Sequence, residues 1–321
     1  MLTFRSGGWV LVLAAALTIG IACAALLANR GNLSKRAVGD GRRAESYGFD
    51  LSTCLVPREA IVPAGPDLRK DGLPVPTDPP ALAARMYTPD TRLAGVRRLT
   101  THDRILGVEI DGQARAYPLW VMCWHEIVND TLGGRPIAVT YSPLCDSAVV
   151  FDRNVAGKTR TFSISGLLYN SNLLMYDRRP DGRGESLWSQ LQFRAVAGPA
   201  ARAGRRLRVR PCVVEPWGRW LARHPETTIS LPDPQRKRLY VRDAYAVYFG
   251  LDHLSYPVEP LPPAGSWKLK TPIVAWRADN VWRVARADRG PPPTVPAAAP
   301  RAYAFWFAWY AMHPDSRVFS P

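Results

Sequence analysis

Groups that ligate metals or transfer protons are concentrated in two short segments of this chain. Residues 123–130 read CWHEIVND and residues 141–146 read YSPLCD. A thiol, an imidazole, an amide and several carboxylates thus lie within an otherwise apolar stretch. Burying such groups costs free energy unless they are paired or bound to something. The two segments therefore predict one functional site.

Two kinds of chemistry fit a site in which Cys145 lies close to His125. A thiolate and an imidazole are typical ligands of a zinc or copper ion, and Glu126 would complete such a metal site. Alternatively, an imidazolium stabilises a thiolate, which is then a nucleophile. In that cysteine-nucleophile enzyme Cys145 attacks, His125 is the base, and Asp146 or Glu126 orients the histidine. Both hypotheses predict that Cys145 is the decisive thiol.

A third hypothesis is a module that binds a ligand or a protein without chemistry. It would use the Trp-rich halves to hold the ligand or partner. In the metal or thiol site, Tyr141 and Asn129 would hydrogen-bond to the occupant. Trp188 and Gln190, in the segment ESLWSQ, are further candidates for ligand binding, although Trp188 also suits plain core packing. The sequence leaves these alternatives open.

The elements that would position these groups are expected to be short. Apolar spacing predicts a helix over Leu119–Asn129, opened by Pro118 and ended by Gly133–Gly134. Its one face would carry Met122, His125, Glu126 and Asn129. Asp-Gly at 111–112 predicts a hairpin. Strands are predicted at 137–141, 148–152, 159–164 and 173–176.

A WxxWxxxHP motif occurs twice, at Trp217–Pro225 and Trp306–Pro314. Each copy predicts a short helix that stops before proline. A second hairpin is predicted around Asp279–Asn280. The sequence thus predicts a mainly β fold with short helices (α+β) in two related β-rich halves, the second shorter. The main domain would span residues 81–230 and carry the His-Glu and Cys motifs, and the second half would span residues 231–321.

Composition narrows the class of protein. The chain has 321 residues, of which 47% are hydrophobic, so a packed globular body is expected. Its 30 prolines argue against a helical bundle. The net charge is +15, but the arginines are not interleaved with aromatic residues as in a stacking platform, so no nucleic-acid binding is expected.

The N-terminus has the pattern of a targeting segment. Residues 9–28 contain no charged residue, so residues 1–30 predict a signal peptide or membrane anchor. Basic residues after this run favour a cytoplasmic C-terminus instead. The preferred expectation is a protein of the cell envelope, exported or anchored facing outward, which contacts the membrane through this segment. Residues 31–80 predict a basic linker and a Pro-rich extended arm. Four later cysteines could form two disulfides in an oxidising compartment.

Several motifs in order resemble one bacterial family. The segments AYPLWVMCWHEIVNDTLGG, VTYSPLCDSAVVFDR, SGLLYNSNLLMYDRR and ESLWSQ are similar to domain of unknown function family 3179, over about residues 105–225. The second motif of that family commonly reads CPLC, whereas this chain has Ser142 at its first position. That departure argues against a dithiol redox site. The resemblance implies kinship without an established activity, and it mildly favours export.

Overall fold

Strands dominate the described part of the chain, and its helices are short. The computed structural model describes residues 38–66, 68–88, 91–93, 95–241, 245–288 and 295–319. The predicted mainly β fold with short helices is confirmed. The predicted signal peptide or anchor at residues 1–30 lies outside the described residues. Within the residues that are described, no helix is both long and apolar enough to cross a membrane.

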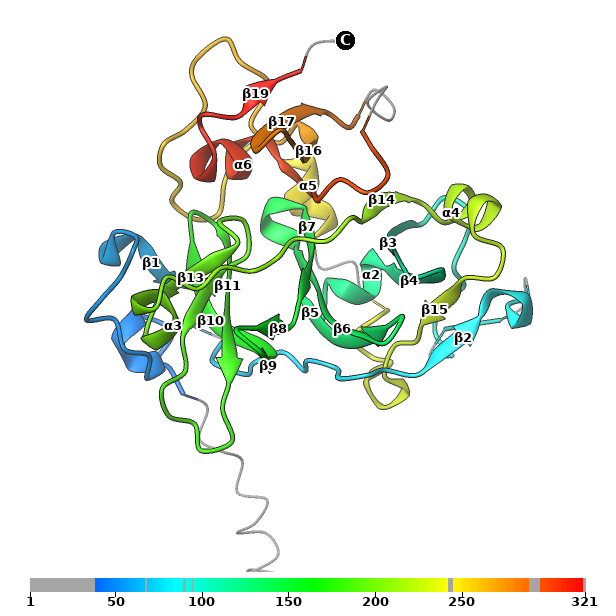
Figure 1. Ribbon diagram of the computed structural model, residues 1–321, viewed down its shortest axis with the longest axis horizontal. Coiled ribbons are helices and arrows are strands. Elements are labelled where there is room, and N and C mark those ends of the chain that lie inside the picture. Colours follow the sequence, from blue (N-terminus) through cyan, green and yellow to red (C-terminus); the bar gives the residue numbers. More distant parts are fainter. Residues whose placement is uncertain are drawn as a thin grey trace, which may run out of the picture. The chain divides into compact units, whose positions relative to one another are not determined.

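Three larger sheets hold most of the described strands (Figure 1). The seven-stranded sheet has the order β19 (Arg317–Val318), β17 (Val281–Arg286), β16 (Pro272–Ala278), β18 (Arg301–Phe305), β7 (Ser147–Asp152), β6 (Arg135–Ser142), β5 (Ile127–Leu132). The β14 sheet has the order β14 (Val213–Pro216), β3 (Arg104–Ile110), β4 (Gln113–Pro118), β15 (Thr228–Ser230), β2 (Ala81–Ala83). The β10 sheet has the order β1 (Ile61–Pro63), β10 (Thr161–Tyr169), β11 (Asn172–Arg178), β12 (Leu187–Ser189), β13 (Arg194–Ala197). A small ribbon pairs β8 (Asn154–Val155) with β9 (Lys158–Thr159).

Short helices connect these strands. The α-helices of the described residues are α2 (Leu119–Met122), α3 (Pro199–Arg202), α4 (Trp217–Arg223), α5 (Ala246–Gly250) and α6 (Trp306–Met312). The 3₁₀ turns there are η2 (Ala44–Tyr47), η3 (Arg58–Ala60), η4 (Ala84–Met86), η5 (Pro143–Cys145) and η6 (Pro234–Arg236).

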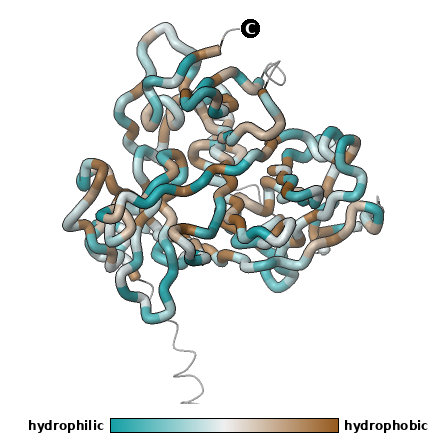
Figure 2. The backbone as a smooth tube through the Cα atoms, viewed as in Figure 1, coloured by the Kyte–Doolittle hydropathy of each residue, from teal (hydrophilic) through white to brown (hydrophobic). Residues whose placement is uncertain are grey.

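The β5–β7 part of the seven-stranded sheet is buried on both faces. Ala138 packs in the core shared with the β10 sheet, and the next residue, Val139, packs in the core shared with the β14 sheet. Phe151 and Val150 of β7 divide between the two cores in the same way. Successive side chains of a strand point to opposite faces, so a strand buried on both faces is a continuous apolar run. Figure 2 shows such hydrophobic stretches in brown.

The predicted helix over Leu119–Asn129 is wrong beyond its first turn. α2 ends at Met122, and β5 begins at Ile127. Glu126 has a left-handed φ of 54°, which a continuing helix does not allow, and the β-branched Ile127 favours a strand. Gly133–Gly134 forms the turn between β5 and β6, with φ of 57° and 70°, rather than a helix end.

The two WxxWxxxHP segments are both helices of seven residues, α4 and α6. Before them, β14 pairs antiparallel with β3, and β18 pairs antiparallel with β16. After them, β15 pairs in parallel with β4, and β19 pairs in parallel with β17. The same strand–helix topology therefore occurs twice. Residues 119–212, which hold the predicted site, are inserted into the first copy. Because β18 also pairs with β7, the seven-stranded sheet contains strands from both predicted halves.

Candidate functional site

The turn between β6 and β7 directs two adjacent site residues to opposite faces of the sheet. After η5, Asp146 takes a left-handed φ of 43°. The Cys145 thiol donates to the Ser171 carbonyl in the turn of the β10 sheet, at 3.2 Å. The Asp146 carboxylate instead accepts from the Arg104 guanidinium of β3, at 2.9 and 3.1 Å, and from the Tyr141 hydroxyl at 2.7 Å. The predicted single site is thus divided by the sheet.

His125 is held by two hydrogen bonds that use both ring nitrogens. Its Nδ1 donates to the Pro74 carbonyl at 2.6 Å, because a carbonyl can only accept. Nε2 lies 2.7 Å from the Tyr240 hydroxyl and accepts from it in the neutral ring. Burial lowers the pKa of His125, which keeps the ring neutral. Its lone pair is therefore not available to a metal or a substrate.

The predicted pairing of His125 with Cys145 is not what the described residues show. Each of the two side chains bonds to other partners. Burial raises the pKa of the Cys145 thiol, the opposite of what an activated nucleophile needs. Within the described residues, no group of three or more His, Cys, Asp and Glu side chains could hold a metal ion. The donor set therefore does not fit the zinc or copper site that the sequence predicts.

Three of the predicted ligand-binding residues hold the sheets together instead. The Asn129 side chain exchanges two hydrogen bonds of 2.9 Å with the Phe162 backbone, which links β5 to β10. The Gln190 amide bonds at 2.7–3.2 Å to side chains and backbone of β6, β7 and β11. Trp188 is buried and donates to Asp177 at 3.1 Å. Because their polar atoms are already bonded inside the protein, a ligand has no group left to contact.

Glu126 is the site residue whose environment is most unusual. Its side chain is buried, and desolvation raises the pKa of Glu126 to about 8. No hydrogen bond to its carboxyl group comes from the described residues. The left-handed φ of 54° is rare for glutamate and costs about 1–3 kcal/mol. A buried carboxyl group with a raised pKa on a strained backbone is typical of functional sites.

A cavity of 440 Å³ is lined by residues close to Glu126 in the chain and across the strand, although Glu126 itself is not one of its lining residues. Among the residues that line it are Arg104, Cys123, Tyr141 and Tyr240. The backbone N–H of Tyr141 donates to the backbone carbonyl of Glu126 at 2.7 Å, so the backbone of Glu126 pairs with a residue of this wall. Of the predicted ligand-binding residues Tyr141 lines this cavity. Arg104 and Tyr240 are not predicted from the sequence, because nothing in their own segments points to the site.

The arrangement of Arg104, Asp146 and Tyr141 occurs a second time in the fold. Asp130 of β5 accepts from the Arg115 guanidinium at 2.8 Å and from the Tyr117 hydroxyl at 2.7 Å. Both arginine–aspartate–tyrosine triads join the β14 sheet to the seven-stranded sheet. The role that the structure shows for Asp146 is therefore structural.

The cysteine thiols differ sharply in accessibility. Cys54, Cys123, Cys145 and Cys212 are all thiols, so the two disulfides considered from the sequence are not formed. Burial raises the pKa of Cys212 to about 12, and Cys145 is shielded in the same way.

We expect iodoacetamide to modify Cys123 and Cys54 in the native protein near neutral pH, and Cys145 and Cys212 only after unfolding. Peptide mass mapping at successive times measures the order of labelling. The Cys145→Ala variant is the control and should show the same native labelling. Rapid native modification of Cys145 would restore the sequence-based prediction that it is the decisive thiol.

The fold and the site together define a mainly β domain with a buried carboxyl group and with a separate cavity lined by arginine and aromatic residues. The chain belongs to the family described as Protein of unknown function (DUF3179), whose profile matches residues 70–289. The resemblance seen in the motifs is thereby confirmed. No curated protein and no solved structure matches the chain.

Proposed function

We propose that this domain is an enzyme that binds a small molecule in the 440 Å³ cavity and transfers a proton to or from it through Glu126. The observation that carries the proposal is the neutral, buried carboxyl group of Glu126, with its pKa raised to about 8. A general acid works best when its pKa lies near the operating pH. Glu126 meets that requirement near neutrality, whereas an exposed glutamate does not.

The cavity wall supports this chemistry. Arg104 and Tyr141, which both bond to Asp146, form a polar part of the cavity wall that a substrate can contact. The Cys123 thiol is in the same wall and supplies a polarizable contact. The metal-binding and cysteine-nucleophile hypotheses are less well supported, because His125 is engaged at both nitrogens and Cys145 is buried.

Infrared spectroscopy tests the proposal directly. The native protein at neutral pH should show the carbonyl band of a protonated carboxylic acid, and Glu126→Gln should remove it. Glu185→Gln is the matched control, because Glu185 is also buried but forms an ion pair with Lys70. The proposal fails if the band is absent from the native protein or survives in Glu126→Gln.

A non-catalytic binding module is the second candidate. It is favoured by the hydrogen bonds of Asp146. The carboxylate oxygens of Asp146 already accept from Arg104 and Tyr141, so this carboxylate does not act on a substrate. In that case Glu126 would serve only as a neutral hydrogen-bond donor to a bound ligand. Turnover lost in Glu126→Gln with ligand binding retained would favour the enzyme.

We also propose that the chain is exported or anchored in the cell envelope, on the basis of the uncharged run at residues 9–28. An alkaline phosphatase fused after Pro321 should be active in intact bacterial cells, because this reporter folds only after export. A fluorescent protein at the same position is the complementary reporter. Bright fluorescence with an inactive phosphatase would show a cytoplasmic C-terminus, as the basic residues after the run favour.

A further inference from the structure

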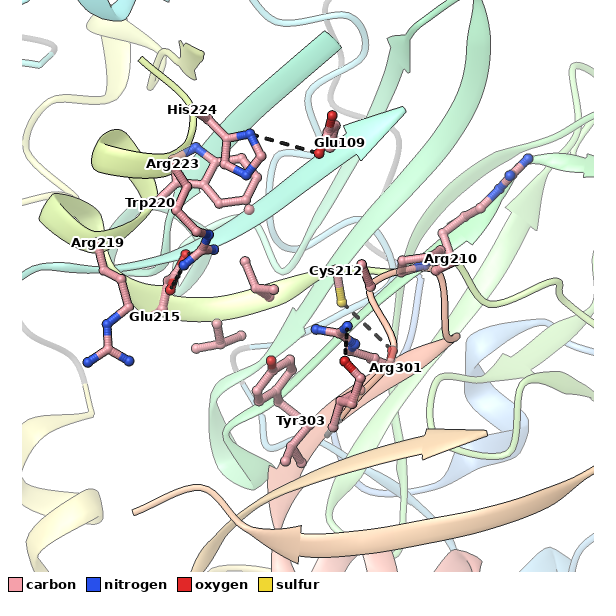
Figure 3. A pocket seen from close by; sticks show the side chains of 18 of the residues that line it. Glu109, Arg210, Cys212, Glu215, Arg219, Trp220, Arg223, His224, Arg301 and Tyr303 are labelled. Carbon is pink, nitrogen blue, oxygen red and sulfur yellow. Dashed lines mark hydrogen bonds and ion pairs between the residues drawn. The ribbon is translucent and has the colours of Figure 1, made fainter. Parts of the chain in front are cut away.

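A second cavity, of 920 Å³, lies between the β14 sheet and the strands β16 and β18 (Figure 3). Gly107, Val214 and Trp220 line one side, and Val274 and Tyr303 line the other. It shares no lining residue with the 440 Å³ cavity. Small-molecule sites commonly have volumes of about 300–1,000 Å³. The size and the apolar wall therefore suit an organic ligand, and we call this space the β14 groove.

The shape of the β14 groove depends on a close contact at Gly107. A Cβ atom on this residue would lie 2.5 Å from the Trp220 ring, so only glycine lets the indole pack flat on β3. The indole nitrogen donates to Thr227 at 2.9 Å, which fixes the ring. Trp220 is thus a rigid part of the wall and does not move aside to fill the groove.

Two of the three carboxylates that line the β14 groove form ion pairs with arginine. Pairing a carboxylate with a cation cancels most of its field on a third group. The pairs are Glu215 with Arg223 at 2.9 Å and Asp111 with Arg135 at 2.9 Å. The third carboxylate, Glu109, is exposed to solvent and lies 3.8 Å from the His224 ring, so water screens its charge.

Two arginines of the β14 groove have no carboxylate partner among the described residues. Arg219 is exposed at the rim, and Figure 3 shows its side chain with no ion pair to the other residues drawn. Arg301 donates to the carbonyls of Val295 and Pro296, at 3.2 and 2.6 Å, and its buried Nε atom has no hydrogen-bond partner among the described residues. The groove thus has an apolar wall with a cation at the rim and another on β18.

The two copies of the WxxWxxxHP motif, on α4 and α6, differ in the surroundings of their histidines. In the second copy, His313 stacks on Trp309 and its Nε2 bonds to the Leu191 carbonyl at 2.6 Å. Burial lowers the pKa of His313 to about 4. In the first copy, His224 stacks on Trp220 in the same way, at 3.9 Å between ring centroids, but it lines the β14 groove. The histidine of the motif is therefore bonded inside the protein in the second copy, whereas in the first copy it lines the groove.

We propose that the β14 groove is a second binding site, for an elongated apolar molecule that bears a carboxylate or phosphate group. Arg301 binds the anionic group, Arg219 attracts it from the rim at longer range, and Val214, Trp220 and Tyr303 contact the apolar part. A lipid-derived molecule and a soluble metabolite could both carry this chemistry. The site does not depend on Glu126 or on the proposed reaction.

Calorimetric titration of the purified full-length chain with four probes tests this proposal. Decanoate or decyl phosphate should bind, decylamine should bind at least about tenfold more weakly, and acetate should show no measurable binding. Tighter binding of decyl phosphate points to a phosphate ligand, and tighter binding of decanoate points to a carboxylate ligand. Equal binding of decylamine, or no binding of either anionic decyl probe, would overturn the proposal.

Variants then place the probe in the groove. Arg301→Gln should weaken binding about tenfold or more, because it removes a charged hydrogen-bond donor. Arg219→Gln should weaken binding less, because it removes a more distant charge at the rim. Arg58→Gln is the matched control, since Arg58 is an exposed arginine paired with Glu45 outside the groove. Unfolding temperatures confirm that the variants are folded. Unchanged binding in both folded groove variants would refute the assignment, and Glu126→Gln should bind the probes like the native protein.

Discussion

Replacing Glu126 by glutamine should make the protein more stable at alkaline pH and remove a pH dependence of its unfolding. The pKa of Glu126 is raised from its ordinary value of 4.5 to about 8 in the folded state. The folded protein therefore binds this proton more tightly than the unfolded chain does. Its stabilising effect is complete below pH 4.5 and is lost as the pH rises through 8.

The size of the effect follows from the shift. A difference of 8 − 4.5 = 3.5 units corresponds to about 5 kcal/mol at 1.36 kcal/mol per unit. Glutamine cannot ionise, so the variant keeps the stability of the neutral form at every pH. Urea unfolding of both proteins at pH 5, 7 and 9 measures the difference, and titrations elsewhere in the chain cancel in it. A difference that does not change with pH would mean that Glu126 is ionised like an ordinary surface carboxylate.

Breaking the Arg104–Asp146 ion pair should cost about 2–3 kcal/mol of unfolding free energy, measured on Asp146→Asn. Fully buried pairs lose about 3–5 kcal/mol when one partner is removed, because the other is left as an uncompensated charge. The Arg104 side chain is 45% exposed, so water screens part of the loss. Asparagine retains the tolerance for the left-handed backbone at this position.

The second triad provides a matched comparison. Arg115 is only 16% exposed and Asp130 is 2% exposed, so Asp130→Asn should cost more, about 3–5 kcal/mol. In each triad, replacing both partners, as in Arg104→Met with Asp146→Asn, should cost less than the sum of the single changes. Additive losses would show that the two side chains do not stabilise each other.

Short sequence patterns predict the hairpins and strands whose contacts are close in the sequence. Asp-Gly at 111–112 predicts the β3–β4 hairpin, and the apolar runs at 137–141 and 148–152 predict β6 and β7. The helical spacing that starts at Leu119 continues past the true end of α2, because apolar residues in a doubly buried strand imitate a helix stripe. Residues 127–132 form a strand because they pair with β6, and the apolar spacing does not encode this pairing.

The candidate site is harder to predict from the sequence, because the residues that contact each other there are far apart in the chain. Glu126 is identified by its residue type, but its neutral state depends on burial by the surrounding sheets. Arg104 lies 42 residues from its partner Asp146, and no local pattern links them. Cys145 is close to His125 in the sequence, yet it faces the β10 sheet while His125 is bonded to the Pro-rich arm at Pro74.

The two buried faces of β6 and β7 restrict how this segment can evolve. Neighbouring residues such as Ala138 and Val139 belong to different cores, so inserting one residue would exchange the contents of the two cores. Substitutions of similar volume disturb only one core and leave the order of faces intact. The stretch from 137 to 151 should therefore tolerate changes of composition far better than changes of length.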